Sequence, residues 1–422
     1  MDYSVLRKIV LDCFKIDRID YERTRVLTIA HDNDRSLFHE GKWYSPLIDT
    51  MEDDLAARGT RCVSISRITS RIKGPISYGN ARSPEGRFAR SLLRKRLAGL
   101  FTKGKYPYKA TYPYSRSEQR IWEEILERTG ARRVFGIQPS RELCVACHER
   151  GIWVADVQHG VIAERHPWYG ENFRARDPVE WLPDTFLLWD HGSERVIKKW
   201  SEKKGIVPIV TGNRWVARFM KSLPSDKLVA QLSERVAASR AANDRRKTIL
   251  VALSWGDYNI PNGFIIEGLE QVIRKTSQEF RWLIRLHPNQ LKGFATEEGP
   301  RFFRYFEERL KGHAEWESAT RPPLPAVLKH VDLHISWMSS VCIEASQMGI
   351  RSALLNPRLR DPEQIGDYYE YYREVGTVEL VEESEASILA WIRRTLSREA
   401  VPEDYAAYDR EYSRLLDFLV AE

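Results

Sequence analysis

The sequence has 422 residues, 42% of them hydrophobic and 30% charged, which is the composition of a globular protein with room for two domains. No apolar run approaches the ~20 residues that span a bilayer, and Asp2, Lys8, Asp12 and Lys15 interrupt any signal-like stretch. Together with an odd number of cysteines, five, these features argue against an exported or membrane-spanning protein and predict free thiols in the cytoplasm.

Short apolar runs alternate with helical patterns along the whole chain. In the first half, the runs expected to form strands are Val26–Ala30, Cys62–Ile65, Arg133–Ile137, Trp153–Val157, Thr185–Leu188 and Val207–Val210. In the second half they are Thr248–Leu253, Trp282–Leu286, Val331–Ile335 and Ala353–Leu355. The helices expected between them include Glu118–Thr129, Arg141–Arg150, Glu194–Lys204, Gly263–Lys275, Phe302–Lys311 and Val341–Met348. This alternation predicts an α/β protein of two Rossmann-like domains with parallel sheets.

A charged stretch without strand character separates the two blocks. We therefore predict an N-terminal domain over residues 1–221, a linker over 222–246 and a C-terminal domain over 247–402. A final helix over 403–422 is expected to pack its stripe against a core, because it carries, at helical spacing, Tyr405, Tyr408, Tyr412, Leu415 and Leu419.

The positive charge is concentrated in one segment. Between Arg71 and Lys109 stand eleven basic residues and one acid, Glu85, so this segment is +10 while the whole chain is +7 and the remainder −3. A local anionic partner fits this distribution better than nucleic-acid binding.

Within that segment, Arg87–Leu100 has the pattern of a basic amphipathic helix. Its apolar positions at helical spacing are Phe88, Leu92, Leu93, Leu97 and Leu100. Its crowded basic positions are Arg90, Arg94, Lys95 and Arg96. The pattern indicates either a helix that lies on an anionic membrane surface or a solvated helix packed on its domain.

Two polar strings follow predicted strands of the second block. Ser339 and Ser340 lie where a strand gives way to a helix, and Glu344 follows about one turn later. Unpaired N–H groups at such a helix start bind phosphate, and an acidic residue there can accept hydrogen bonds from ribose hydroxyls. The alternative is an ordinary serine cap beside a solvated glutamate.

The other string is Arg285-Leu286-His287-Pro288. Arg285 and His287 alternate on one face of the strand end, where either cation could neutralise a leaving phosphate, although a lone strand-end histidine is more often structural. Ser254 and Gly256 follow a third strand, and the glycine permits close approach of the backbone to a ligand.

The first block offers candidates for proton transfer. His159, in Asp156-Val157-Gln158-His159-Gly160, stands after a predicted strand and could act as a general base near neutral pH or orient the acceptor. Asp32 and Glu40 lie in acidic turns after the first strand, and each could be a base, a nucleophile or a metal ligand, or only part of a solvated loop.

One string suggests haem attachment and is rejected. Cys144-Val145-Ala146-Cys147-His148 has the CxxCH spacing, but such attachment belongs to exported proteins, and the string lies inside a predicted helix with its cysteines on the packing face. No second ligand pair with zinc spacing is present either, so we expect no metal site and no resident cofactor.

These strings, in this order, resemble the GT-B glycosyltransferases that build bacterial capsules, O-antigens and related surface glycans. The resemblance spans about residues 133–357. The strings that carry it are Val157-Gln158-His159-Gly160, Leu182-Pro183-Asp184, Val210-Thr211-Gly212-Asn213, Arg285-Leu286-His287-Pro288 and Ser339-Ser340 with Glu344. The His-Pro and Ser-Ser pair is similar to that of Kdo transferases, polysialyltransferases and teichoic-acid glycerophosphotransferases, which use cytidine-nucleotide donors.

The resemblance implies a division of roles. His287, Ser339 and Ser340 would hold the donor phosphate, Glu40-Gly41 is the nearest match to an acidic-Gly catalytic motif, and the His-Gly string favours His159. The expected fold is GT-B with a cleft between the domains, and the expected partners are a nucleotide-sugar donor such as CMP-Kdo and a glycan or lipid-linked acceptor.

Three rival functions remain open on the sequence. A non-hydrolysing nucleotide-sugar epimerase shares this fold and a similar motif layout. A non-catalytic nucleotide-binding protein would bind without turnover, and a nucleic-acid binder would use the basic segment.

Overall fold

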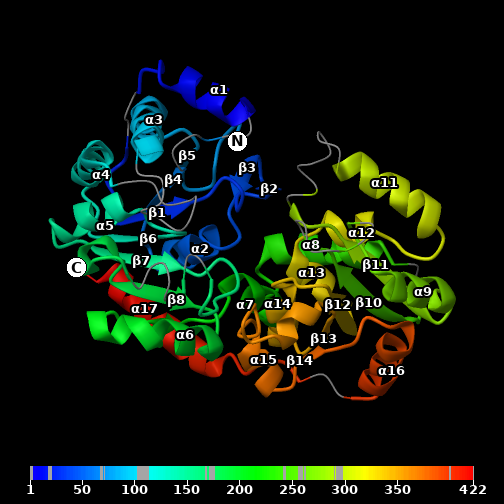
Figure 1. Cartoon of the computed structure of the whole chain (residues 1–422). Coiled ribbons are helices and arrows are strands. Elements are labelled where there is room, and N and C mark those ends of the chain that lie inside the picture. Colours follow the sequence, from blue (N-terminus) through cyan, green and yellow to red (C-terminus); the bar gives the residue numbers. More distant parts are fainter. Residues whose placement is uncertain are drawn as a thin grey trace. The chain divides into compact units, whose positions relative to one another are not determined.

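The computed structural model describes residues 3–17, 21–66, 70, 72–101, 114–166, 169–170, 176–240, 244–254, 260, 263–288, 290, 298–398 and 401–421. The chain divides into two compact units (Figure 1). Unit 1 comprises Met1–Arg214 and Ala406–Glu422, and unit 2 comprises Trp215–Tyr405. The stretch suggested as a linker holds helix α8, Lys227–Ala238, which packs against α13, Leu324–Leu328, within unit 2.

Unit 1 is built on a parallel sheet of order β5-β4-β1-β6-β7-β8-β9. Its strands are β1 Val26–Ala30, β4 Cys62–Ser66, β5 Gly79–Asn80, β6 Arg133–Gly136, β7 Trp153–Val157, β8 Thr185–Leu188 and β9 Ile209–Val210. Between β1 and β4 the chain forms an antiparallel hairpin of β2 Leu37–His39 and β3 Lys42–Tyr44. All residues of β1 and β4 are buried, as expected for a parallel sheet covered on both faces.

Helices cover both faces of this sheet. They are α1 Tyr3–Asp12, α2 Asp49–Ala57, α3 Glu85–Phe101, α4 Arg116–Thr129, α5 Arg141–His148, α6 His191–Ser201 and α17 Ala406–Val420, with short 3-10 turns Val179–Trp181 and Glu202–Lys204. Leu27 and Ile29 of β1 pack in the core that includes residues of α3, α4 and α5, while Val26 and Ala30 pack in the core that includes residues of α2 and α17. Successive side chains of β1 point to opposite faces of the sheet, so they pack alternately in these two cores.

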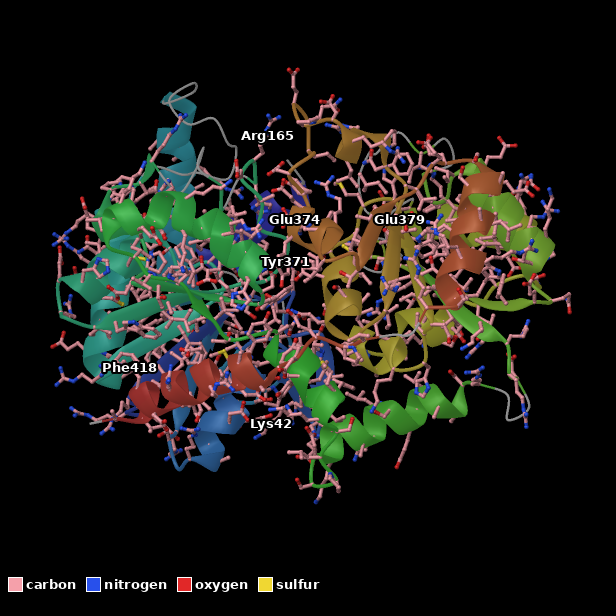
Figure 2. All side chains as sticks on the ribbon, turned by 90° about the horizontal axis from the view of Figure 1, so that it is seen from below. Lys42, Arg165, Tyr371, Glu374, Glu379 and Phe418 are labelled. Atoms are coloured by element: carbon pink, nitrogen blue, oxygen red, sulfur yellow. The ribbon has the colours of Figure 1, made fainter. Side chains whose placement is uncertain are left out.

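The last helix of the chain completes unit 1. Helix α17, red in Figure 1, lies among the blue to green elements of unit 1, and its stripe of Tyr408, Tyr412, Leu415, Leu416 and Leu419 is buried. Figure 2 shows Phe418 on the same helix. Arg133 of β6 places its guanidinium 4.3 Å from the Phe418 ring centroid, and the Trp153 ring of β7 meets Phe418 edge-on at 5.1 Å. The packing expected of the final helix is therefore present.

Unit 2 is built on a second parallel sheet, of order β11-β10-β12-β13-β14. Its strands are β10 Lys247–Ala252, β11 Phe280–Arg285, β12 Leu333–Ser336, β13 Arg351–Leu354 and β14 Val378–Leu380. Its other helices are α7 Arg214–Lys221, α9 Glu267–Thr276, α11 Glu298–Arg309, α12 Glu317–Thr320, α14 Val341–Gln347, α15 Glu370–Glu374 and α16 Glu385–Leu396, with a 3-10 turn over Pro357–Arg360. Its core gathers the alternate residues of β10, β11 and β12 against α9, α11 and α16.

The sequence predicted most of these elements. Every strand that it predicts is present, with ends that differ by at most two residues. The strands that it missed are β2, β3, β5 and β14, each two or three residues long and without an apolar run. The α/β class with two Rossmann-like sheets is confirmed.

The prediction that Lys95 lies on the outer, basic face of this helix is wrong. Helix α3 turns Lys95 inward, only 9% exposed, with its Nζ 2.8 Å from Glu118 Oε2 and 2.6 Å from Glu142 Oε1. Phe88 is in the core as expected, whereas Leu97, assigned to the same apolar face, is 51% exposed. Arg94 remains on the surface. Among the described residues, no helix is both long enough and apolar enough to cross a bilayer.

Candidate functional site

The strand order of unit 2 reverses between β10 and β12, and open parallel sheets bind ligands at such a switch point, outside the carboxyl ends of the strands. Ser254 joins the loops that leave three neighbouring strands there. Its hydroxyl accepts from the Met338 N–H at 3.1 Å, beyond β12, and its carbonyl accepts from Gln290 Nε2 at 3.4 Å, beyond β11. The predicted polar strings therefore meet at one edge of the sheet.

The two serines after β12 leave hydrogen-bonding groups available. The Ser339 hydroxyl accepts from the Val341 N–H at 3.3 Å, whereas Ser340, at the N-cap position of α14, makes no side-chain cap bond. The serine that caps is thus Ser339. The N–H groups of Ser339 and Ser340 donate to no acceptor within the described part of the chain. Two N–H groups and a hydroxyl at a switch point form a surface that suits an anion.

Arg285 and Glu344 are half-buried and interact electrostatically. Arg285 Nη1 donates to the carbonyls of Ala319 and Pro322, the latter at 2.9 Å. Burial raises the pKa of Glu344, in the first turn of α14, to about 7, although the charge of Arg285 opposes the shift. Burial also lowers the pKa of Arg285 to about 10, against the effect of Glu344. Glu344 can therefore exchange its proton near neutral pH.

His287 stands at the end of β11, beside a glutamine that the sequence did not single out. The Gln290 Oε1 accepts from the His287 N–H at 2.8 Å, and the Gln290 N–H donates to the His287 carbonyl at 2.8 Å. Gln290 is buried and also reaches Ser254, so it fixes the backbone of both loops. Gly256 lies outside the described residues.

Unit 1 has its own switch point, between β1 and β6, where the order of its sheet reverses. His31 directly follows β1, and His159 lies just beyond β7, which is separated from β1 by β6 in the sheet order. The two rings lie nearly parallel, with centroids 6.4 Å apart and planes 20° apart. The structure therefore brings together two imidazoles from segments 128 positions apart in the numbering.

His159 is held from two sides. Its Nδ1 lies 2.7 Å from the Tyr169 hydroxyl, and Tyr169 is itself buried and accepts at its carbonyl from Trp200 Nε1 at 3.1 Å. Gln158, fully buried, donates to the Gly160 carbonyl at 2.8 Å and accepts from the Trp189 N–H at 2.8 Å. A hydrogen bond at one ring nitrogen selects the tautomer, which decides whether the other nitrogen is a base or an acid.

The two acidic candidates differ in setting. Asp32 follows His31, and its Oδ1 accepts from the hydroxyls of Ser66 at 3.1 Å and Ser70 at 3.2 Å. Glu40 occupies the turn of the β2–β3 hairpin with a side chain that is 73% exposed, 3.8 Å from His39 Nε2. Asp32 shares the switch point with the histidines, whereas Glu40 is solvated on the hairpin.

A buried charged cluster anchors the turn that carries His31 and Asp32. Arg35, 2% exposed, donates its N–H to the His31 carbonyl at 3.3 Å and its Nη2 to Ser64 Oγ at 2.7 Å. Its Nη1 lies 3.5 Å from Asp49 Oδ1. Glu52, also buried, accepts from the Thr28 hydroxyl, and burial together with the charge of Asp49 raises the pKa of Glu52 well above its usual range. A protonated Glu52 leaves Arg35 and Asp49 as one neutral pair.

The cysteine string lies on α5 as predicted. Cys144 and Cys147 are buried free thiols, and burial raises the pKa of the Cys147 thiol well above its usual range. Within the residues that the structure describes, no group of three or more His, Cys, Asp or Glu side chains is arranged to hold a metal ion.

Solved structures with this architecture are numerous. The chain is 16% identical to UDP-GlcNAc 2-epimerase from Neisseria meningitidis bound to UDP-GlcNAc, with a TM-score of 0.55 over 94% of this chain and 99% of that one. It is 12% identical to UDP-GlcNAc 2-epimerase from Methanocaldococcus jannaschii, with a TM-score of 0.57 over 93% and 99%. It is 10% identical to the wall teichoic acid polymerase TagF, with a TM-score of 0.53 over 99% and 89%.

The fold is GT-B. At these identities the likeness establishes the fold of two Rossmann-like domains and leaves the chemistry to the residues of the site. No protein-family model matches the sequence, and no curated protein matches it significantly.

Sequence reasoning missed several positioning residues of this GT-B chain. Gln158 and Gln290 each lie within a predicted string or just after it, and their amides could have been suspected of tying loops to the sheet. Tyr169 and Arg35 carry no comparable signal, because their partners are brought together only by the fold.

Proposed function

We propose that the chain is a glycosyltransferase that takes a sugar from a nucleotide donor and passes it to a glycan or lipid-linked acceptor. The observation that carries this proposal is the switch point of unit 2, where unpaired N–H groups, the Ser340 hydroxyl and the pair of Arg285 with Glu344 stand together. Such groups suit the phosphate and ribose of a nucleotide.

The roles of these residues in sugar transfer follow from the charges that develop during the reaction. As the bond between sugar and phosphate breaks, negative charge grows on the nucleotide, and the N–H groups of Ser339 and Ser340 with the His287 side chain would stabilise it. In unit 1, His159 would remove the proton of the acceptor hydroxyl, in the tautomer set by Tyr169. A cytidine nucleotide is the preferred donor in this proposal, on the resemblance of the His-Pro and Ser-Ser strings.

The second candidate is a nucleotide-sugar epimerase. It is favoured by the likeness to two epimerase structures and by the adjacent His31 and Asp32 at the switch point of unit 1, which offer groups to remove and return a proton. The two candidates differ in their need for an acceptor. An epimerase converts its donor alone, whereas a transferase requires an acceptor hydroxyl.

A calorimetric panel of CMP, CDP, UDP, GDP and dTDP tests the nucleotide site. We expect one cytidine nucleotide to bind most tightly, and Ser340→Ala to weaken that binding about tenfold, because a hydrogen bond to a charged group is lost. The matched control is Ser384→Ala, which removes the N-cap serine of α16 in the same unit. It should lower thermal stability slightly and leave nucleotide affinity unchanged.

The outcomes of this panel separate the possibilities. Preference for another nucleotide overturns the cytidine assignment, and no binding of any nucleotide overturns the proposed function. Incubation of the matching nucleotide sugars without acceptor, followed by chromatography, then identifies an epimerase by conversion of the donor.

Glu344 predicts how nucleotide binding depends on pH. The pKa of this carboxyl is about 7 in the free protein, and ribose hydroxyls that donate to its ionised form lower that pKa. Binding should therefore release a proton below pH 7, and affinity should rise with pH by up to about tenfold per unit until it levels off above 7. Glu344→Gln should abolish this dependence.

Titration calorimetry in two buffers of different ionisation enthalpy counts the protons released. The phosphate of the nucleotide titrates equally with both proteins, so the difference between wild type and Glu344→Gln reports Glu344 alone. An affinity that falls as pH rises would instead place the phosphate, rather than the ribose, beside this carboxyl.

A further inference from the structure

The first helix of unit 1 presents apolar side chains outward. Leu11 is 59% exposed, and beyond the end of α1 Phe14 is 81% and Ile16 93% exposed. Asp12, at the end of the helix, is buried instead. Asp12 is 3% exposed and accepts from Lys8 and from Lys15, each at 2.7 Å. Ile9 of the same helix is 1% exposed, so one side of α1 packs on the core while apolar residues at its end and just beyond it stay exposed.

Helix α3 borders this apolar surface with arginines. Figure 1 shows α1 beside α3, and Arg90 Nη1 donates to the Cys13 carbonyl at 2.6 Å, which fixes the guanidinium at the base of the surface. Arg94 is exposed one turn further along α3, and Leu97 is exposed on the next turn. We call Leu11, Phe14, Ile16, Arg90 and Arg94 the α1–α3 surface.

The carboxylates beside this surface are already compensated. Glu85 is buried and bonds to Lys15, and Asp17 accepts from the N–H groups of Gly86 at 2.7 Å and Arg87 at 2.8 Å. Asp12 pairs with Lys8 and shares Lys15 with Glu85, so two lysines neutralise these two carboxylates. Among the described residues no carboxylate forms an ion pair with Arg90 or Arg94, so this part of the α1–α3 surface combines apolar bulk with net positive charge.

We propose that the α1–α3 surface docks on an anionic lipid bilayer, with Leu11, Phe14 and Ile16 inserted at the level of the headgroups and Arg90 and Arg94 facing lipid phosphates. Isolated exposed apolar residues are ordinary, but a cluster with flanking arginines has the complementarity of an interfacial surface. The positive charge disfavours pairing of two copies of this surface, because like charges would be brought together. The proposal does not rest on the function of the nucleotide site.

Vesicle flotation of the full chain tests this docking. We expect the protein to float with vesicles of phosphatidylcholine containing about a third phosphatidylglycerol, and not with phosphatidylcholine alone. The double variant Phe14→Ser with Ile16→Ser should lower the bound fraction at least tenfold. Arg94→Glu should weaken binding several-fold, and salt should weaken wild-type binding, because the arginine contribution is screened.

Matched controls lie in unit 2. Leu223 is 59% and Val401 71% exposed, so Leu223→Ser with Val401→Ser removes comparable exposed apolar side chains elsewhere. Arg398→Glu reverses an exposed arginine of unit 2. Both controls should bind as wild type, and thermal unfolding verifies that every variant is folded.

Each remaining outcome overturns the proposal. If the wild-type protein does not float with the anionic vesicles at low salt, the α1–α3 surface does not dock on a bilayer. Equal losses in the controls mean that binding is unspecific. Should sedimentation velocity instead show a dimer that the Phe14 and Ile16 substitutions dissociate, without vesicle binding, the occupant is a second copy of the chain.

Discussion

Replacing His159 by alanine is expected to lower turnover by about 10²–10⁴-fold, the range for loss of a general acid–base group. Nucleotide affinity should stay within about twofold of wild type, because the phosphate groups are assigned to unit 2, whereas His159 follows β7 of unit 1. Steady-state kinetics with a nucleotide sugar and a soluble acceptor, beside calorimetry with the nucleotide alone, separates the two effects. Wild-type turnover in a folded His159→Ala protein would make this histidine structural.

Tyr169→Phe is the matched variant for that experiment. It keeps the aromatic ring, which packs edge-on against Phe186 with centroids 6.3 Å apart, and removes only the hydroxyl at 2.7 Å from His159 Nδ1. We expect a smaller loss of turnover and a displaced pH–rate profile, since the tautomer of His159 is no longer selected. A purely structural tyrosine would leave the pH profile of the residual activity in place.

The second large effect is on stability. Lys95→Met should destabilise unit 1 by about 3–5 kcal/mol, because Glu118 and Glu142 then remain buried without their shared cation. Burial and the charge of Glu118 already raise the pKa of Glu142, and removal of Lys95 raises it further. A raised pKa in the folded state gives stability that is lost as pH rises, so the destabilisation should be larger at pH 8 than at pH 5.

Amide hydrogen exchange in α3 and α4 reports on unit 1 separately from unit 2. Arg94→Met, at the neighbouring exposed position, is the control and should change stability by no more than about 0.5 kcal/mol. Adding Glu118→Gln and Glu142→Gln to Lys95→Met should recover much of the loss. A Lys95→Met protein as well protected as Arg94→Met would mean that the buried ion pairs contribute nothing.

The fold could be predicted to this extent because parallel strands buried on both faces leave a strong local signal. Runs such as Val26–Ala30 and Trp153–Val157 are apolar at four of five positions, and their bounds agree with β1 and β7. Strand β14 and the β2–β3 hairpin lack such runs and depend on their neighbours, so no local pattern indicated them.

The candidate site was predictable in part for the same reason. Polar residues directly after buried strands, such as His159, His287 and Ser339, are placed by the carboxyl ends of those strands. The orientation of Lys95 was not predictable, because Glu118 and Glu142 lie on other helices, α4 and α5, and helical spacing along α3 places a basic residue there on the outer face. Likewise, only the folded sheet brings His31 beside His159.

The last helix of the chain, α17, belongs to unit 1. During synthesis unit 1 is therefore completed after unit 2, although its first residues are made earlier. Unit 2 is one continuous segment, Trp215–Tyr405, and all of it has left the ribosome before α17 has. Unit 1 begins to emerge first, yet the core around Val26, Met51 and Leu55 lacks the part that Tyr412 and Leu415 supply until α17 arrives. The nascent first domain therefore keeps part of this core uncovered during synthesis of the second one, and such exposed apolar surface favours aggregation.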